Sequence, residues 1–506
     1  MRTNSIATSM AFASLCLSGA AQAQAPEFDT AAIDRSVTTY MSANEVPGVV
    51  IGVVVGNAVV YAKAFGVADV SNGSPMQKNS MFQIASVTKL FTASLMVALE
   101  QDGILMAGDP VDTYLDGATA PRDAHGRAIR LMDLATHTSG LPANPLNRRD
   151  RPDSPTVMEP YSQSDLYEAL ADTRVLWASG GGLTYSNFGY GLLGHALERA
   201  AGIPLEEAMR RRLWEPLGME HTYVSGRPSG APSLAAHHWD WYSPRRPSPA
   251  MEFGAIWGMN GVHSNMPDLA HFLSLQFRAY APGGAVIDGR RLAEMHKPRV
   301  MRSQNFDREN GAFGIGWIVK FVEGAGVLIE HDGNNDGHGA YLAALPQEGV
   351  GLIVLANLGG VADEIGEAVL PYVLEPVIAR KRNLQNAFER GEWEAVRNSA
   401  EELLVLNRHN RRARYFLGRA LAETGQCDEA GSHLATAYAA GMYREYVAFY
   451  QAVCAAQAEY FDMADEALER AVELGFLEGE RLERHPALDA LAGLPAYELL
   501  KRYAHH

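Results

Sequence analysis

Short, valine-rich runs typical of β-strands lie at two places far apart in the chain, and this separation constrains the fold more than any other feature. The segment Val46–Ala62 reads as two strands that turn at Gly56-Asn57, a pair of residue types that favours a tight hairpin. Three further runs follow far downstream, at Gly326–Glu330, Ala340–Leu345 and Gly351–Ala356. We expect these two sets of strands to form one sheet.

Helical patterns fill the interval between the two sets of strands, for example at Ser86–Glu100 and Tyr190–Arg212. The last two strand runs are separated only by the turn-like sequence at 346–349, so they should pair antiparallel. The expected fold class is therefore mixed α and β (α+β), in which an antiparallel sheet made of N- and C-terminal strands is covered by helices.

The character of the chain changes after about Leu374, where helix formers dominate and strand signals are almost absent. The chain has 506 residues, which is too long for one compact core. The segments Gly391–Glu394 and Gly425–Asp428 stand 34 positions apart, and 34 residues is the tetratricopeptide period. A looser third copy centres on Phe461-Asp462, with a capping helix expected near Pro495–Tyr503.

These observations predict two domains after an N-terminal leader. The first should span residues 24–378, and the second, at 379–506, should be an all-α, tetratricopeptide-like repeat domain. An unrelated helical bundle is the alternative for the second domain. Its partner cannot be read from the sequence, although repeat surfaces commonly bind other proteins.

Residues 1–23 have the pattern of an export signal. Arg2 supplies a positive start, Ile6–Leu17 is mostly apolar, and Ala21-Gln22-Ala23 offers a small-x-small cleavage site. Leu15 is too bulky to make Cys16 a lipidated cysteine. A retained membrane anchor is the alternative, but the apolar stretch is shorter than the ~20 residues that a membrane span needs. We expect a periplasmic or secreted protein.

Charge and cysteine content limit the possible partners and cross-links. The formal net charge of -16 would repel phosphate backbones, so nucleic acid is excluded as a partner. After cleavage only Cys427 and Cys454 would remain, too few for a disulfide framework. They either pair with each other or stay as buried free thiols.

The strongest chemical signal is a Ser-x-x-Lys spacing at the start of a helical pattern, with Ser86 and Lys89 on one helix face. A serine hydroxyl is a poor nucleophile until a base takes its proton, and a nearby ammonium tunes such a base. The helix N-terminus favours negative charge on the attacked carbonyl oxygen. The spacing by itself is weak evidence, because ordinary helices also show it.

Further motif-like blocks follow in a fixed order and give the Ser-x-x-Lys spacing its context. They are Thr136–Pro142, Leu183–Gly194, Pro216–Met219, Gly261–Ser264, Phe313–Trp317 and His331–Gly333. With these blocks, the segment from Phe28 to Leu374 resembles the serine beta-lactamase superfamily, in its branch of class C beta-lactamases, family VIII esterases and penicillin-binding-protein-like hydrolases.

The resemblance implies a role for each matching residue. Ser86 would be acylated, and Tyr185, in a Tyr-x-Asn motif, would act as base together with Lys89. Asn187 would contact substrate. His331-Asp332-Gly333 matches the third motif of the family, which makes His331 a catalytic candidate and Gly333 a substrate-binding one.

The backbone N–H groups of Ser86 and Asn334 would form the oxyanion hole. Because the reference pKa of tyrosine is near 10, Tyr185 needs a cation such as Lys89 to lower its pKa before it can act as a base.

The third motif departs from that of true beta-lactamases, which carry a lysine and a hydroxyl residue to bind the substrate's carboxylate. Here His331 is mostly neutral at pH 7 and Asp332 is negative. If Asp332 faces the cleft, the site should bind anions poorly. This favours an ester, amide or peptide substrate over antibiotics.

Other histidines and glycines have structural explanations. His137 is expected to be a turn residue, and His338 a loop residue at the start of a strand. His237 and His238 are adjacent, which is poor geometry for chelation, and no His-Glu-x-x-His pattern occurs. Gly180–Gly182 lacks the Lys-Ser/Thr that a phosphate-binding loop needs. No metal or other cofactor is implied.

The leading prediction is an exported serine hydrolase that works through an acyl-enzyme at Ser86. A beta-lactamase or a D-peptide-specific peptidase is the nearest alternative, and the shape of the pocket would decide between them. A non-catalytic scaffold that binds a partner through the helical repeats is a second alternative, against which the intact Ser86, Lys89 and Tyr185 argue.

Overall fold

In the computed structural model, the described residues are 27–504 without 124, 148–149, 152–153, 159, 176, 178–179, 239–243, 247–250, 282 and 303–310. The predicted export signal at 1–23 lies outside them. Among the described residues, no helix combines the length and the apolar content needed to cross a membrane.

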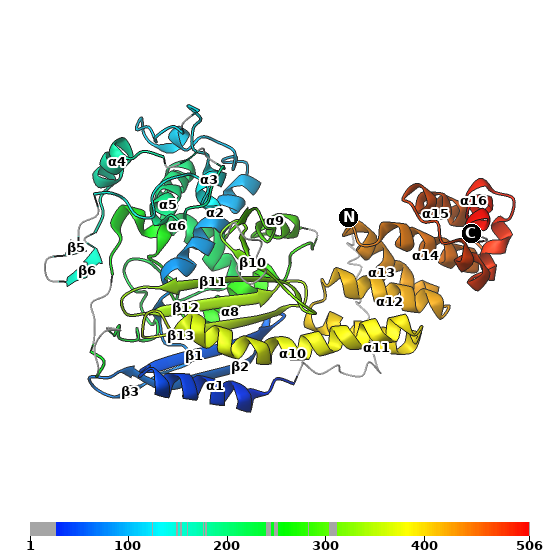
Figure 1. Cartoon of the computed structure of the whole chain (residues 1–506), viewed down its shortest axis with the longest axis horizontal. Helices are drawn as coiled ribbons and strands as arrows, with labels where there is room; N and C mark the ends of the chain where they lie inside the picture. Colours follow the sequence, from blue (N-terminus) through cyan, green and yellow to red (C-terminus); the bar gives the residue numbers. More distant parts are fainter. Residues whose placement is uncertain are drawn as a thin grey trace, which may run out of the picture.

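A nine-stranded sheet, ordered β3-β2-β1-β13-β12-β11-β10-β9-β8, forms the centre of the N-terminal part (Figure 1). Its pairings among the described residues are antiparallel. The strands are β1 Gly48–Val55, β2 Ala58–Asp69, β3 Ser74–Pro75, β8 Val300–Met301, β9 Ala312–Phe313, β10 Ile318–Val322, β11 Gly326–Asn334, β12 Gly339–Leu345 and β13 Val350–Ala356. Strand β1 pairs with β2 on one side and β13 on the other, which confirms the prediction that distant strands share one sheet.

Helices cover both faces of the sheet, because alternate residues of the central strands point to opposite sides. Val50 and Val54 of β1 pack into a core shared with α2 (Thr88–Gln101) and α5 (Asn187–Ala201). Val49 and Ile51 pack into a second core with α1 (Thr30–Ala43) and α10 (Ala362–Glu389). The strand is therefore buried along its whole length, as expected for a strand covered on both faces.

The helices of the N-terminal part are α1 Thr30–Ala43, α2 Thr88–Gln101, α3 Leu131–Ala135, α4 Gln163–Asp172, α5 Asn187–Ala201, α6 Leu205–Met209, α7 Glu215–Leu217, α8 Met266–Gln276 and α9 Gly289–Met295. Shorter turns are η1 Ala85–Val87, η2 Val111–Tyr114, η3 Arg210–Trp214 and η4 Gly254–Met259, and two small sheets pair β4 Phe82–Gln83 with β7 His263–Ser264 and β5 Asp150–Arg151 with β6 Ser154–Met158.

The helical pattern over Tyr190–Arg212 contains more than one helix. Gly202 adopts a left-handed φ of 67° and ends α5, and Pro204 then caps the separate helix α6. Glycine is common just after the end of a helix, and proline is common where a helix begins.

The C-terminal part is all-helical over its described residues. Its helices are α10 Ala362–Glu389, α11 Trp393–Leu406, α12 Arg411–Glu423, α13 Cys427–Ala439, α14 Arg444–Gln457, α15 Phe461–Glu473 and α16 Pro495–Tyr503, with short turns η5 Gly479–Arg484 and η6 Pro486–Leu491. Each of the two predicted repeat signatures starts with a glycine of positive φ, Gly391 or Gly425. Helices α11 and α13 begin two residues after these glycines. The tetratricopeptide assignment stays a prediction.

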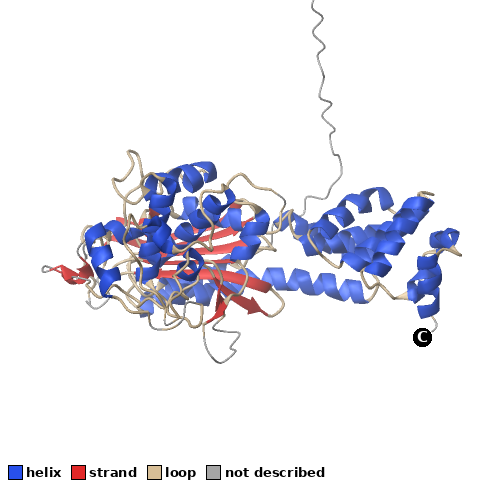
Figure 2. Cartoon of the chain, turned by 90° about the horizontal axis from the view of Figure 1, so that it is seen from above, coloured by secondary structure: helices blue, strands red, loops and turns tan. Residues whose placement is uncertain are grey.

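The helical part packs onto the sheet domain as a continuation of one of its cores. Residues of β13, α10, α11 and α14 belong to the same buried apolar cluster, and α10 runs through the expected domain boundary at 378 as one helix. Figure 2 shows these helices extending from one side of the sheet domain.

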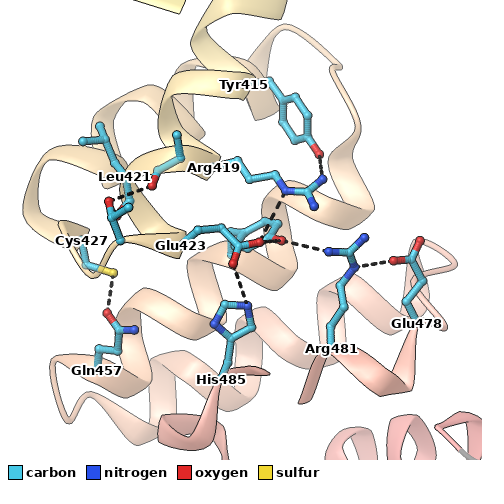
Figure 3. Close-up of polar contacts among 12 residues, drawn as sticks. Tyr415, Arg419, Leu421, Glu423, Cys427, Gln457, Glu478, Arg481 and His485 are labelled. Atoms are coloured by element: carbon cyan, nitrogen blue, oxygen red, sulfur yellow. Dashed lines mark hydrogen bonds and ion pairs between the residues drawn. The ribbon is translucent and has the colours of Figure 1, made fainter. Parts of the chain in front are cut away.

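A polar cluster ties the end of the chain to the central helices (Figure 3). The Glu423 carboxylate accepts a 2.6 Å hydrogen bond from the Tyr450 hydroxyl and lies 3.7 Å from the His485 ring and 3.8 Å from Arg419. The buried Arg419 guanidinium also stacks 4.4 Å from the centre of the Phe388 ring. These contacts account for the polar groups at the centre of an otherwise apolar bundle.

Cys427 and Cys454 form a disulfide between α13 and α14, with their Cα atoms 5.1 Å apart. Of the two predicted alternatives, pairing is the one observed. Both residues are half-buried.

Candidate active site

Ser86 lies at the entrance to the buried helix α2. The chain reaches it through β4 and Ile84, and Ala85 takes a left-handed φ of 48°, an uncommon conformation for a residue with a Cβ. This turn directs Ser86 out of the core, so its side chain is half-buried while Ala85 and Val87 on either side are buried.

Lys89 is fully buried in the first turn of α2. Its Nζ donates hydrogen bonds to Ser86 Oγ at 2.9 Å and to the Met259 carbonyl at 2.8 Å. Burial lowers the pKa of Lys89 to about 7, against the opposing charge of Asp332. A lysine with this pKa is partly neutral at physiological pH and can accept the Ser86 proton.

Tyr185 comes from the loop before α5 and meets the same two residues. Its hydroxyl is hydrogen-bonded to the Ser86 side chain, and Lys89 Nζ lies 5.0 Å from the centre of its ring. Burial raises the pKa of Tyr185, and the hydrogen bond with Ser86 only partly offsets that effect. Desolvation therefore outweighs the lowering that was expected from Lys89, and the role of Tyr185 as a base stays a prediction.

The end of β11 closes the site against η1. A Cβ built on Gly333 would lie 2.3 Å from the Ile84 carbonyl oxygen and 3.0 Å from the Ser86 nitrogen. Only glycine allows this approach. The backbone that follows, at Asn334, is thus held near the Ser86 amide.

His331 is buried on the same strand. Its Nδ1 lies 2.5 Å from the Asp332 carbonyl oxygen, and because a carbonyl only accepts, Nδ1 carries the proton. Its Nε2 is buried without a hydrogen-bond partner in the described residues. Burial lowers the pKa of His331, so the ring is neutral, as expected from the sequence.

Asp332 points away from Ser86. It pairs directly with Tyr341 of β12, so the two side chains lie on the same face of the sheet, and Tyr341 packs against Gly366 of α10. Gly333, one residue on, faces η1 instead. The condition behind the expected poor binding of anions, that Asp332 faces the cleft, is therefore not met.

Asn187 and Asn334 make contacts other than with the reactive groups. The Asn187 side chain, in the first turn of α5, donates to Asn144 Oδ1 at 3.1 Å. Asn334 Oδ1 accepts from the Gly360 backbone at 2.9 Å. Their predicted contacts with substrate stay predictions.

Several residues near the site were not singled out from the sequence. Met259 supplies the carbonyl that holds Lys89, and it belongs to η4, which has no motif of its own. Arg302 carries a positive charge close enough to lower the pKa of both Tyr185 and His331. A lone arginine in a loop gives no signal in the sequence.

His137 is a buried turn residue with a left-handed φ of 59°. Its Nδ1 accepts a hydrogen bond from the Ser186 backbone N–H at 3.0 Å, and its ring centre lies 4.4 Å from that of Tyr185. The His137 ring therefore packs against the Tyr185 ring.

His338 and His237 make structural contacts. The His338 ring accepts from the Gln83 backbone N–H and bonds the Ala235 carbonyl, and it stacks 3.8 Å from the His237 ring. Among the residues that the structure describes, no group of three or more His, Cys, Asp or Glu is placed to hold a metal ion.

Comparison with known proteins gives a consistent family. A family model described as Beta-lactamase matches residues 33–370. The D-alanyl-D-alanine-carboxypeptidase/endopeptidase AmpH of Escherichia coli (strain K12) is 28% identical over 345 residues, which cover 66% of this chain and 85% of that protein. A beta-lactamase of Pseudomonas fluorescens is 26% identical over 362 residues, which cover 64% of this chain and 92% of that protein.

Solved structures show the same fold. A beta-lactamase/D-alanine carboxypeptidase from Yersinia pestis, solved with citrate, is 25% identical and superposes with a TM-score of 0.55 over 69% of this chain and 99% of that chain. The octameric penicillin-binding protein homologue from Pyrococcus abyssi is 23% identical, with a TM-score of 0.59 over 71% of this chain and 81% of that chain. The chain therefore belongs to the beta-lactamase family and is a serine hydrolase.

Proposed function

We propose that this protein hydrolyses an ester, amide or peptide bond through an acyl intermediate on Ser86. The observation that carries the proposal is the hydrogen bond from a fully buried Lys89, with a pKa of about 7, to Ser86 Oγ. An amine in this state can take a proton at neutral pH, which a serine needs in order to attack.

In the proposed reaction, Ser86 Oγ attacks the substrate carbonyl and its proton passes to the Lys89 amine. The oxyanion is bound by the Ser86 backbone N–H and, as predicted, by that of Asn334. The protonated Tyr185 hydroxyl gives its proton to the leaving group and regains one from Lys89. Water then attacks the acyl group and passes its proton to Tyr185 and Lys89. Lys89 returns a proton to Ser86 Oγ, which frees the serine.

The leaving side of the substrate is proposed to carry a carboxylate. The Asp332 side chain lies on the α10 face of the sheet. Its negative charge still acts on Lys89, Tyr185 and His331, and the positive charge of Arg302 also reaches Tyr185 and His331. We propose that Arg302 binds the anionic group of the substrate, which replaces the prediction of an ester, amide or peptide in preference to antibiotics. The related proteins named D-alanyl-D-alanine carboxypeptidase and beta-lactamase make D-Ala-D-Ala peptides and beta-lactams the first compounds to test.

Location outside the cytoplasm is part of the proposal. The disulfide between Cys427 and Cys454 is the kind of bond that persists in oxidising compartments. Together with the signal-like sequence at 1–23, it supports a periplasmic or secreted enzyme.

The test is a substrate panel of a D-Ala-D-Ala peptide, nitrocefin and short p-nitrophenyl esters, with wild type, Ser86→Ala and Arg302→Gln. We expect that every substrate of the panel that is hydrolysed requires Ser86. Arg302→Gln should lower kcat/KM for the peptide and nitrocefin but not for the esters. Equal loss for all three substrates would contradict the proposed role of Arg302. Absence of Ser86-dependent turnover would overturn the proposed function and favour the binding scaffold.

A further inference from the structure

A cavity of about 580 Å³ lies where the helical part meets the sheet domain. Its walls come from the β1–β2 turn at Gly56 and Asn57, the end of α8, the loop before α9 and the α11–α12 turn at Leu406–His409. The volume lies in the range of small-molecule sites. Neither domain could form this cavity alone.

The α11–α12 turn is held in place by hydrogen bonds to the sheet domain. Asn407 Nδ2 donates to the carbonyls of Phe277, Pro346 and Gln347 at 2.9–3.0 Å. Asn410 Nδ2 donates to Glu348 at 2.6 Å. The cavity is therefore preformed.

The charged groups around the cavity are cationic. Arg278 and Arg408 line it, and no Asp or Glu is among the described lining residues. The chain as a whole has a net charge of -16, so this concentration of positive charge runs against its average composition.

Arg278 is half-buried at the cavity wall. Its Nε is buried without a hydrogen bond in the part of the chain that the structure describes. By contrast, Arg212 forms a two-point ion pair with Asp102. A buried N–H donor without a hydrogen-bond partner is costly unless something else accepts from it.

The other walls are apolar. Leu217, Leu275, Phe277, Val286 and Ile287 line the cavity, and Val405 is 52% exposed beside it. A ligand that fits would therefore combine an apolar body with an anionic head.

The cavity is distinct from the Ser86 site. Across the sheet, Asn334 pairs with Gly339, Gly339 with Ala356, and Ala356 with Val49 at one end of β1. The Ser86 site therefore lies at this end of β1, while the cavity adjoins Gly56 at the other end. The strand between them spans roughly 20 Å.

We propose that this cavity is a second binding site, which takes a small amphipathic anion with its phosphate or carboxylate head on Arg278 and Arg408 and its apolar body against the walls around Phe277. The site would bind such a compound without hydrolysing it, since Ser86 lies at the other end of the sheet.

The test is calorimetric titration of the full chain carrying Ser86→Ala with hexyl phosphate and, separately, hexanoate, which distinguishes the two head groups. We expect saturable binding of one of them at one site per chain, and none of hexyltrimethylammonium. Arg278→Gln or Arg408→Gln should weaken binding roughly tenfold to a hundredfold, and the exposed Arg502→Gln should leave it unchanged.

Thermal unfolding separates a binding role of Arg278 from a structural one. Because Nε has no partner, Arg278→Gln should keep the melting temperature of the ligand-free protein and lose the shift that the ligand induces. Ser274→Trp, which fills the cavity, should also abolish binding. Unchanged affinity in Arg278→Gln, or wild-type affinity in a folded Ser274→Trp, would overturn the proposal.

Discussion

Replacing Lys89 with arginine keeps a positive charge beside Ser86 but removes a group that can lose its proton near neutral pH. With a pKa of about 7, the neutral fraction of Lys89 is about 0.1 at pH 6 and about 0.9 at pH 8, whereas arginine stays protonated throughout. The wild-type acylation rate should therefore rise about tenfold between these pH values and then level off.

Removing this base should be costly even though the charge is retained. We expect Lys89→Arg to lower kcat/KM by about 10²–10⁴ and to abolish the rise near pH 7. The assay is stopped-flow acylation with a p-nitrophenyl ester from pH 5.5 to 9, with the Ser86→Ala rate subtracted. Lys297→Arg, at an exposed lysine, is the matched control.

Two results would refute this reasoning. A rate that climbs about tenfold per pH unit past pH 9 without a plateau would mean that the ionised Tyr185 phenol is the base, because burial raises its pKa. Full activity in Lys89→Arg would mean that only the charge of this residue matters.

Further expectations concern stability and geometry. Burial holds the folded-state pKa of Lys89 below its unfolded value, so the unfolded chain binds more protons between pH 7 and about 10 and stability rises with pH across that window; urea titrations of Lys89→Met should show a smaller rise, and an equal one would contradict the buried charge. Gly333→Ala should prevent labelling of Ser86 by a fluorophosphonate probe and lower the free energy of unfolding by about 1–3 kcal/mol through overpacking. Gly431→Ala, where a Cβ would meet open space, is the control. Normal labelling of Gly333→Ala would show that the strand need not approach Ser86 so closely. Asn407→Ala leaves three carbonyls without their donor and should cost about 1–3 kcal/mol in denaturant unfolding, and a neutral result would mean that the helices are docked by apolar contacts alone. Cys427→Ser should cost about 3 kcal/mol in the same assay, and reduced wild type should match it; no difference between oxidised and reduced protein would contradict a stabilising bridge.

The sheet could be predicted from the sequence because its signals are local. Valine-rich runs and the Gly56-Asn57 turn mark β1 and β2, and the downstream runs mark β11 to β13. Helix ends were less evident: the apolar pattern over Tyr190–Arg212 continues through Gly202, although Gly202 and Pro204 are residue types that mark helix boundaries.

The members of the site could be found from motifs, but their electrostatics could not. The pKa values of Lys89 and Tyr185 depend on how deeply each is buried, which sequence spacing does not contain. The orientation of Asp332 depends on its register with Tyr341. Arg278 and Arg408 are 130 positions apart in the chain, and their meeting at one cavity follows only from the packing of the helical part.

The central claim is that Ser86 is the nucleophile that forms the covalent intermediate, and its most direct test is intact-mass spectrometry with peptide mapping after treatment with a fluorophosphonate probe, which phosphonylates such a serine. We predict one adduct per chain, on the peptide that contains Ser86, which is absent in Ser86→Ala and forms much more slowly in Lys89→Arg. An adduct on another residue, or equal labelling of Ser86→Ala, would contradict the account.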